Sequence, residues 1–163
     1  MTGSNRNTSR ALTVTVYSPL VTLQPRPRES EDAHATPKPW GREVRFSGMD
    51  SQYVGKLLFV NGGQRLSLQR HDQKDESIAL VSGKALLVLE DADGKLQEFE
   101  MALYTGYRVL PGRAHRLIAV HDSVFVEAST PETGTTFRLA DDYGRGNEVL
   151  DPRHPIDSRN QPD

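Results

Sequence analysis

Residues 62–83 read GGQRLSLQRHDQKDESIALVSG, and this stretch decides the fold that the sequence predicts. Polar and apolar residues alternate through its first half, a period of two that is typical of a β-strand whose faces meet different surroundings. Gln69 and His71 therefore share one face. The polar tetrapeptide 72–75 predicts a turn, and the apolar run after it predicts a returning strand that brings Glu76 near His71. An amide, an imidazole and a carboxylate at this spacing are three of the four ligands of a divalent-metal site.

The composition of the chain restricts the classes of function that it can have. The 163 residues include no cysteine, carry a formal net charge of -2 and hold no apolar run of membrane-spanning length. We therefore expect one soluble domain without disulfides, thiolate metal sites or a cysteine nucleophile. The 20 Lys and Arg residues are scattered among 22 Asp and Glu residues, which argues against a nucleic-acid partner. No N-terminal secretory pattern is recognisable, so a cytoplasmic location without membrane contact is expected.

Turn residues are frequent from residue 40 onward, and short strand-like segments lie between them. Strands at short, even intervals, without competing helical periodicity, predict an all-β domain built as an antiparallel sandwich or barrel. The predicted strands are residues 54–60, 65–71, 77–81, 85–90, 95–99, 107–110, 115–119 and 124–129.

The two ends of the chain differ from its centre. Residues 12–17 alternate like a β-strand, and the proline-rich segment 24–39 predicts an extended connector after it. We therefore expect residues 1–39 to be a flexible N-terminal segment whose strand adds to a sheet edge, in its own subunit or in a dimer mate. The barrel domain is expected over residues 40–145, followed by a polar tail over residues 146–163.

A second motif supplies the fourth ligand. Residues 111–116 read PGRAHR, so a Pro-Gly turn leads into His115, the first residue of an apolar strand. With this motif the sequence resembles the cupin superfamily, whose first motif has the form G-x5-H-x-H-x4-E-x6-G and whose second ends in P-G-x-x-H. The first motif is matched, with Gln in place of the first His, by Gly63, Gln69, His71, Glu76 and Gly83.

The resemblance narrows to the cupin domain of type II phosphomannose isomerases and spans residues 38–145. In that family a Gln stands where other cupins have the first His ligand, as Gln69 does here. The family pattern Q-x-H-x-H-R-x-E-H-W is altered at its third, fourth and last two members. The segments that carry the resemblance are Lys38-Pro39-Trp40-Gly41, Tyr53-Val54-Gly55-Lys56, Leu66-Ser67-Leu68-Gln69, the PGRAHR motif and Asp141-Asp142-Tyr143-Gly144-Arg145; the altered positions are Gln73, Lys74 and Ser77-Ile78.

The resemblance implies a stand-alone cupin of jelly-roll type, also called a double-stranded β-helix, that holds one divalent metal ion. The implied ligands are Gln69, His71, Glu76 and His115. An amide and a carboxylate beside two imidazoles favour zinc or manganese over iron or nickel. The alternative for the same residues is a lumen of hydrogen-bonded polar side chains without metal.

Three further residues are candidates for contact with a substrate. Either Arg145 or Lys56 is suited to bind an anionic group, and the resemblance favours Arg145, whose loop closes over the sugar site in the family. The alternative for both is a solvated surface charge. Glu127 is a candidate acid or base in the lumen.

The altered residues at the site entrance leave three functions open. The leading expectation is a dimeric, metal-dependent enzyme of carbohydrate metabolism, resembling mannose-6-phosphate isomerase, that isomerises or epimerises an anionic, sugar-like small molecule. The second is an iron-dependent cupin dioxygenase that acts on a small organic acid. The third is a non-catalytic sugar-binding cupin.

Overall fold

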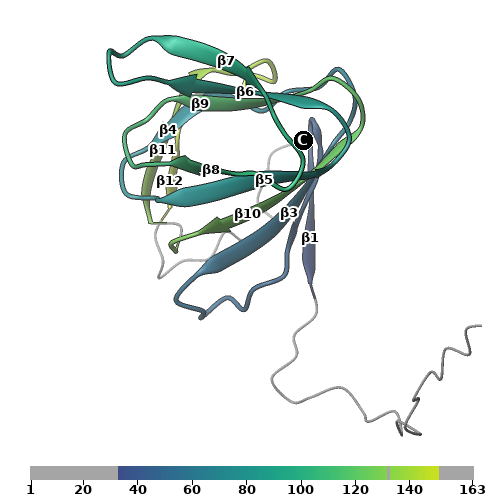
Figure 1. The fold of residues 1–163 in the computed structure, drawn as a ribbon. Coiled ribbons are helices and arrows are strands. Elements are labelled where there is room, and N and C mark those ends of the chain that lie inside the picture. The colour runs from purple at the N-terminus through teal and green to yellow at the C-terminus, as the bar shows by residue number, and fades with distance from the viewer. Residues whose placement is uncertain (1–32, 132, 151–163) are drawn as a thin grey trace, which may run out of the picture. The chain divides into compact units, whose positions relative to one another are not determined.

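The computed structural model describes residues 33–131 and 133–150, which form twelve β-strands and no helix (Figure 1). The strands are β1 (His34–Lys38), β2 (Gly41–Arg45), β3 (Val54–Val60), β4 (Leu68–His71), β5 (Glu76–Ser82), β6 (Ala85–Glu90), β7 (Leu96–Glu100), β8 (Gly106–Val109), β9 (His115–Ala119), β10 (Ser123–Ser129), β11 (Gly134–Ala140) and β12 (Glu148–Leu150). No helix in the described part of the chain is long and apolar enough to cross a membrane.

The strands form two six-stranded sheets, in the orders β1-β2-β3-β10-β5-β8 and β12-β11-β4-β9-β6-β7. Paired neighbours within both sheets are antiparallel. In Figure 1 the layer that holds β3, β10 and β5 lies opposite the layer that holds β6 and β9. The predicted all-β, antiparallel jelly-roll architecture is therefore confirmed.

Three of the predicted strands, residues 54–60, 85–90 and 115–119, have the bounds of β3, β6 and β9. The strand predicted over residues 65–71 is shorter, because Arg65 forms only an isolated bridge with Ile118 before β4 begins at Leu68. The expected strand at residues 12–17 lies outside the described residues.

Four strands were not predicted from the sequence: β1, β2, β11 and β12. Residues 34–38, expected to belong to the extended connector, instead form β1, which pairs with β2 at the edge of the first sheet. Pro37 has no N–H to donate, which an edge strand tolerates. Paired strands thus lie on both sides of residues 40–145. Backbone hydrogen bonds hold such edge strands in place, so they need little apolar sequence and give a weak sequence signal.

The start of β2 depends on a glycine. Gly41 has a φ of +145°, and a Cβ atom at this position would lie 2.0 Å from the carbonyl oxygen of Phe59 on β3. Only glycine allows this backbone approach. Gly41 pairs with Val60 in the register of β2 and β3, so it fixes how β2 joins the sheet.

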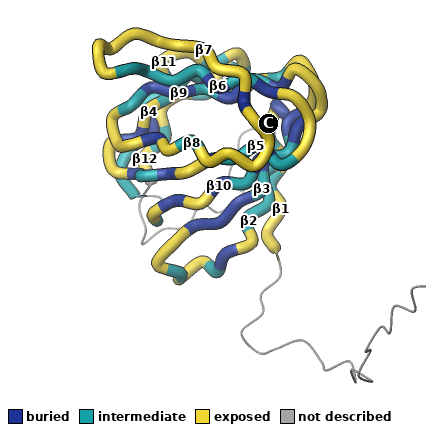
Figure 2. Tube along the Cα trace, in the orientation of Figure 1, coloured by how far each residue is buried: buried dark blue, intermediate teal, exposed yellow. Residues whose placement is uncertain are grey.

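The apolar core lies between the two sheets. Phe125 on β10 and Leu80 on β5 come from one sheet, and Leu87 on β6 and Leu117 on β9 come from the other. All four are at most 1% exposed. Along β10 burial alternates with the period of two that side chains on a strand follow, as Figure 2 shows for the central strands, whereas β7 is exposed along its whole length.

Candidate metal centre and cavity

The polar site continues the inward-facing rows of the core. Because strand side chains alternate, Glu76 has the same orientation along β5 as the core residue Leu80, and His115 the same along β9 as Leu117. Glu127 follows Phe125 in the same way on β10. The sequence thus replaces the apolar side chains of each inward row by polar ones near one end of the sandwich.

Three of the four predicted ligands meet there. His71, Glu76 and His115 are buried, and one potential ligand atom from each lies within 4.8 Å of the others. Glu76 Oε1 is 2.9 Å from His115 Nε2 and 3.7 Å from His71 Nε2. The carboxylate comes from one sheet and both imidazoles from the other, so the cluster forms only when the sheets pack.

The imidazoles present their Nε2 atoms to the cluster. His115 Nδ1 is 3.3 Å from the carbonyl oxygen of Arg113, which can only accept, so in the neutral ring a proton on Nδ1 leaves the lone pair on Nε2. His71 Nδ1 is 2.9 Å from Thr136 Oγ1 on the neighbouring strand β11. Hydrogen bonds from the outer ring nitrogen orient metal-binding histidines in this way.

The carboxylate of Glu76 provides a test of whether a cation fits. Its Oε1 atom is buried without a hydrogen-bond partner among the described residues, although His115 Nε2 lies 2.9 Å away. A buried carboxylate oxygen without a hydrogen bond is unfavourable unless a cation lies beside it. The donor set, two imidazoles and a carboxylate, is one that divalent transition metals accept. The residues therefore fit a divalent metal ion.

The charge state of Glu76 is also the one that binding a cation requires. Burial by itself would raise the pKa of the carboxyl group, but opposing effects, of which the charge of Lys74 is the largest, hold the pKa well below its usual range. Glu76 is thus a carboxylate at neutral pH, the form that binds metals.

Gln69 lies directly opposite His115 in the register of β4 and β9. Its Nε2 atom is 3.4 Å from His71 Nε2, and its Oε1 atom accepts a hydrogen bond of 2.7 Å from Ser67 Oγ. Rotation of the carboxamide by 180° exchanges these atoms and turns the oxygen, the ligand atom of an amide, toward the cluster. The Ser67 hydroxyl then accepts from the amide nitrogen, so both orientations satisfy the serine.

A buried ion-pair network adjoins the cluster. Lys74 Nζ lies 2.7 Å from Glu76 Oε2 and 2.6 Å from Glu127 Oε1. Lys56 Nζ lies 3.2 Å from Glu43 Oε1. Burial raises the pKa of Glu127, as does the charge of Glu76, while the two lysines oppose the rise. Glu127 and Lys56, both predicted from the sequence, are therefore members of one buried network beside the triad.

Lys74 was not among the site residues predicted from the sequence, although it was noted as an altered position of the family pattern. Residues 72–75 were expected to form a polar turn, and Lys74 within this segment is only 5% exposed. One feature of the sequence could have indicated that Lys74 lies beside Glu76. Lys74 comes two residues before Glu76, the separation that places side chains on one face of an extended chain.

The network lines a cavity of about 130 Å³ between the sheets. Its walls carry five cationic and three anionic side chains besides His71. These are Lys38, Lys56, Lys74, Arg138 and Arg145, and Glu43, Glu127 and Glu148. A second space of about 10 Å³ is lined by Gln69, Glu76 and His115 and shares Gln69 and Glu127 with the larger cavity. Its volume is close to that of one water-sized sphere, so an ion-sized space adjoins the larger cavity.

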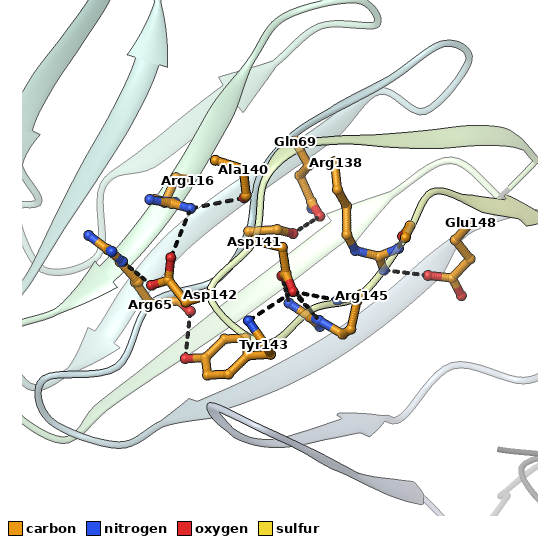
Figure 3. Close-up of polar contacts among 12 residues, drawn as sticks. Arg65, Gln69, Arg116, Arg138, Ala140, Asp141, Asp142, Tyr143, Arg145 and Glu148 are labelled. Carbon is orange, nitrogen blue, oxygen red and sulfur yellow. Dashed lines mark hydrogen bonds and ion pairs between the residues drawn. The ribbon is translucent and has the colours of Figure 1, made fainter. Parts of the chain in front are cut away.

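Arg145 lies at the wall of this cavity but is engaged by its own loop. Its Nη2 and Nε atoms lie 2.6 and 3.1 Å from Asp141 Oδ1, and its backbone N–H donates to Asp141 Oδ2. Figure 3 shows Asp141 directed toward Arg145, and Asp142 toward Arg65 and Arg116. Asp142 thereby ties the loop 141–145 to Arg65 and Arg116, while the bonds between Asp141 and Arg145 hold the loop to itself.

Arg138 on β11 is a further cationic residue of the cavity wall. Its Nη2 atom lies 2.6 Å from Glu148 Oε2, and its Nη1 atom donates to the carbonyl oxygen of Gly146. Its Nε–H is buried without a hydrogen-bond partner among the described residues. Arg138 and Glu148 were not anticipated because their strands, β11 and β12, were not predicted.

These features together define a protein of the cupin class: an antiparallel jelly roll whose two motifs bring a His, a Glu and a second His to one buried point. Residues 26–128, well over half of the chain, match the family model described as mannose-6-phosphate isomerase C-terminal. The chain belongs to this family. No curated relative matches it.

Solved structures with a similar fold include three that are informative. The capsular polysaccharide assembling protein CapF from Staphylococcus aureus has a TM-score of 0.56 at 14% identity, over 76% of this chain and 33% of that chain. The formate complex of Lactobacillus farciminis oxalate decarboxylase has a TM-score of 0.58 at 19% identity, over 66% and 34%. Bacillus subtilis oxalate decarboxylase, with its Mn(II) centres, has a TM-score of 0.56 at 14% identity, over 66% and 30%. At these identities the likeness shows the fold alone, and this chain spans about a third of each of those chains.

Proposed function

We propose that the protein is a metal-dependent isomerase or epimerase that acts on a small, anionic, sugar-like molecule. The observation that carries this proposal is the buried, unpartnered Oε1 atom of Glu76, which faces two imidazole nitrogens beside a charged cavity. Membership of the mannose-6-phosphate isomerase C-terminal family supports the choice of substrate class.

His71, Glu76 and His115 would hold the metal ion, with the amide oxygen of Gln69 as the fourth protein ligand. Four protein ligands leave coordination positions open when the metal accepts five or six ligands. A bound divalent ion supplies Lewis-acid polarisation of a carbonyl or hydroxyl oxygen.

The remaining chemistry falls to side chains of the cavity wall. An aldose–ketose isomerisation moves a proton between neighbouring carbons, so it needs a group that takes up and returns a proton. Glu127 lines both cavities and has a raised pKa caused by burial, which brings its carboxyl group closer to neutral operating pH. We assign it the proton transfer.

The anionic end of the substrate is assigned to the arginines of the opposite wall. Arg145 keeps its guanidinium at the cavity through Asp141, and Arg138 contributes a buried Nε–H that has no other partner among the described residues. Guanidinium groups bind phosphate and carboxylate oxygens in a fixed, directional geometry. Lys56 and its partner Glu43 both lie on the other sheet, and Lys56 adds positive charge to the same cavity.

The test is an isomerase assay with mannose 6-phosphate and a panel of related sugar phosphates, followed by NMR. The protein is first stripped with a chelator and then loaded separately with Mn²⁺, Zn²⁺, Co²⁺ or Fe²⁺. We expect turnover that depends on the metal and is lost in His71→Ala, whereas His121→Ala, an exposed control, retains it. No turnover of any sugar phosphate with any of the metals would exclude the isomerase.

One observation favours a second candidate. The cavity of about 130 Å³ is smaller than the roughly 300–1,000 Å³ of pockets that enclose drug-sized ligands, which suits a compact organic acid. The corresponding enzyme is an iron-dependent dioxygenase. Oxygen consumption by the iron-loaded protein with small organic acids, together with absent isomerase turnover, would favour the dioxygenase. Sugar-phosphate binding without any turnover would instead favour a non-catalytic sugar-binding cupin.

A further inference from the structure

Lys74 links two carboxylates that come from different strands. Its ammonium group lies 2.7 Å from Glu76 Oε2 on β5 and 2.6 Å from Glu127 Oε1 on β10, and its side chain is 5% exposed. An ammonium group has three donors, so it can bond both carboxylates at once. Each of the two anions is therefore held in a fixed place by the same cation.

The contact divides the two oxygens of Glu76 between different tasks. Oε2 is occupied by Lys74, and Oε1 is left without a hydrogen-bond partner at 2.9 and 3.7 Å from the two imidazole Nε2 atoms. A carboxylate whose second oxygen is held by an ammonium group offers a metal one oxygen only, and its torsion angle is fixed before the metal arrives.

We infer that Lys74 is a positioning residue that orients Glu76 for metal binding and is itself held in place by Glu127. The residue acts through Glu76 and needs no contact with substrate. This inference rests on the metal site of the proposed function, but not on the isomerase reaction.

The test compares Lys74→Met, which removes the charge at similar length, with Lys74→Arg, which keeps it. Lys84→Met is the matched control, because Lys84 is half exposed and its ion pair with Glu100 lies on the surface. The affinity of each purified full-length variant for Zn²⁺ is measured by competition with a chromophoric chelator. The Mn²⁺ EPR spectrum reports the ligand geometry, and near-UV circular dichroism in excess chelator reports the fold.

We expect Lys74→Met to bind Zn²⁺ about 10- to 100-fold more weakly, the usual effect of losing a partner that orients a metal ligand. Lys74→Arg should recover most of the affinity and the Mn²⁺ spectrum, and Lys84→Met should match the unaltered protein. Recovery by Arg distinguishes orientation of Glu76 from simple filling of space, because Met fills the space equally well.

Unchanged affinity and an unchanged Mn²⁺ spectrum in Lys74→Met would overturn the inference. If Lys74→Met does not fold, the Zn²⁺ affinity of Glu127→Gln tests the inference instead. A loss of Zn²⁺ affinity of at least about threefold supports the inference, and an affinity equal to that of the unaltered protein overturns it. Metal binding by the unaltered protein without any sugar-phosphate turnover would refute the proposed reaction and leave this inference standing. No metal binding by the unaltered protein would overturn both, before any variant is compared.

Discussion

Glu76 Oε1 and His115 Nε2 lie 2.9 Å apart although the two residues belong to different sheets. The carboxylate oxygen has no hydrogen-bond partner among the described residues. The contact connects the candidate metal site directly to the packing of the two sheets. A cation at this point would stabilise the sandwich as well as equip it for chemistry.

The first prediction follows from this linkage. A metal ion at a concentration about 100-fold above its dissociation constant stabilises the folded protein by about 2.7 kcal/mol. For a domain of this size the melting temperature should rise by roughly 5–10 °C. Differential scanning calorimetry in excess chelator and after addition of Zn²⁺ or Mn²⁺ measures the rise. His115→Ala should remove it, and an equal rise in His115→Ala would show that the metal binds elsewhere.

Gln69 supplies the second prediction. If its amide oxygen is a ligand, Gln69→Ala should weaken Zn²⁺ binding by about tenfold or more, whereas Gln69→His, which offers an imidazole nitrogen at the same place, should retain binding. Chelator competition measures both. Ser67→Ala is the control for the hydrogen bond that Gln69 makes in the structure, and it should have a smaller effect. Equal affinity of Gln69→Ala and the unaltered protein would reduce the protein ligands to His71, Glu76 and His115.

The third prediction concerns Gly41, where a Cβ atom would lie 2.0 Å from the carbonyl oxygen of Phe59. Gly41→Ala must displace β2 from β3 and should lower the free energy of unfolding substantially. Gly63→Ala is the matched control: Gly63 also has a positive φ, +80°, but its Cβ would meet nothing within 4 Å. The control should therefore cost only the backbone strain, about 1–2 kcal/mol. Urea unfolding of both variants checks this, and equal midpoints would contradict the close approach seen in the structure.

The fourth prediction is a pH dependence of stability set by Asp141. Burial raises the pKa of Asp141, but bonds from the Arg145 guanidinium and from the backbone N–H groups of Tyr143 and Arg145 outweigh it, so the pKa lies below the ordinary value of 3.8. A carboxyl group with a lowered folded-state pKa adds stability above its unfolded pKa and loses it as the pH falls through the folded value. Asp141→Asn should therefore destabilise the protein at pH 6, and the difference should shrink below pH 3.8.

Urea unfolding at pH 6 and at several values below pH 4 measures this difference. Glu98→Gln, which changes an exposed carboxylate on the outer strand β7, is the control and should show no comparable pH-dependent difference. A difference between Asp141→Asn and the unaltered protein that is constant across this range would exclude the carboxylate as its source.

Much of the fold could be predicted from the sequence because the central strands are short apolar or alternating segments bounded by turn residues. The bounds of β3, β6 and β9 follow from apolar runs between turn residues, and the spacing of Gln69, His71 and Glu76 follows from the period of a strand. The edge strands were not readable in this way. In β1, β2 and β12 polar residues are common, and pairing with a neighbour holds them where their own pattern gives little signal.

The sequence by itself determined which residues are candidates for metal binding and which of them share a strand face, because residue type and strand period are local properties. Only the tertiary structure decided that Lys74 is buried between Glu76 and Glu127, that Arg138 lines the cavity, and that Asp141 holds Arg145. Each of these depends on how side chains distant in sequence meet when two sheets pack. A charged residue in a polar turn has the same sequence signature whether it faces water or two carboxylates, and the packing of the sheets decides between them.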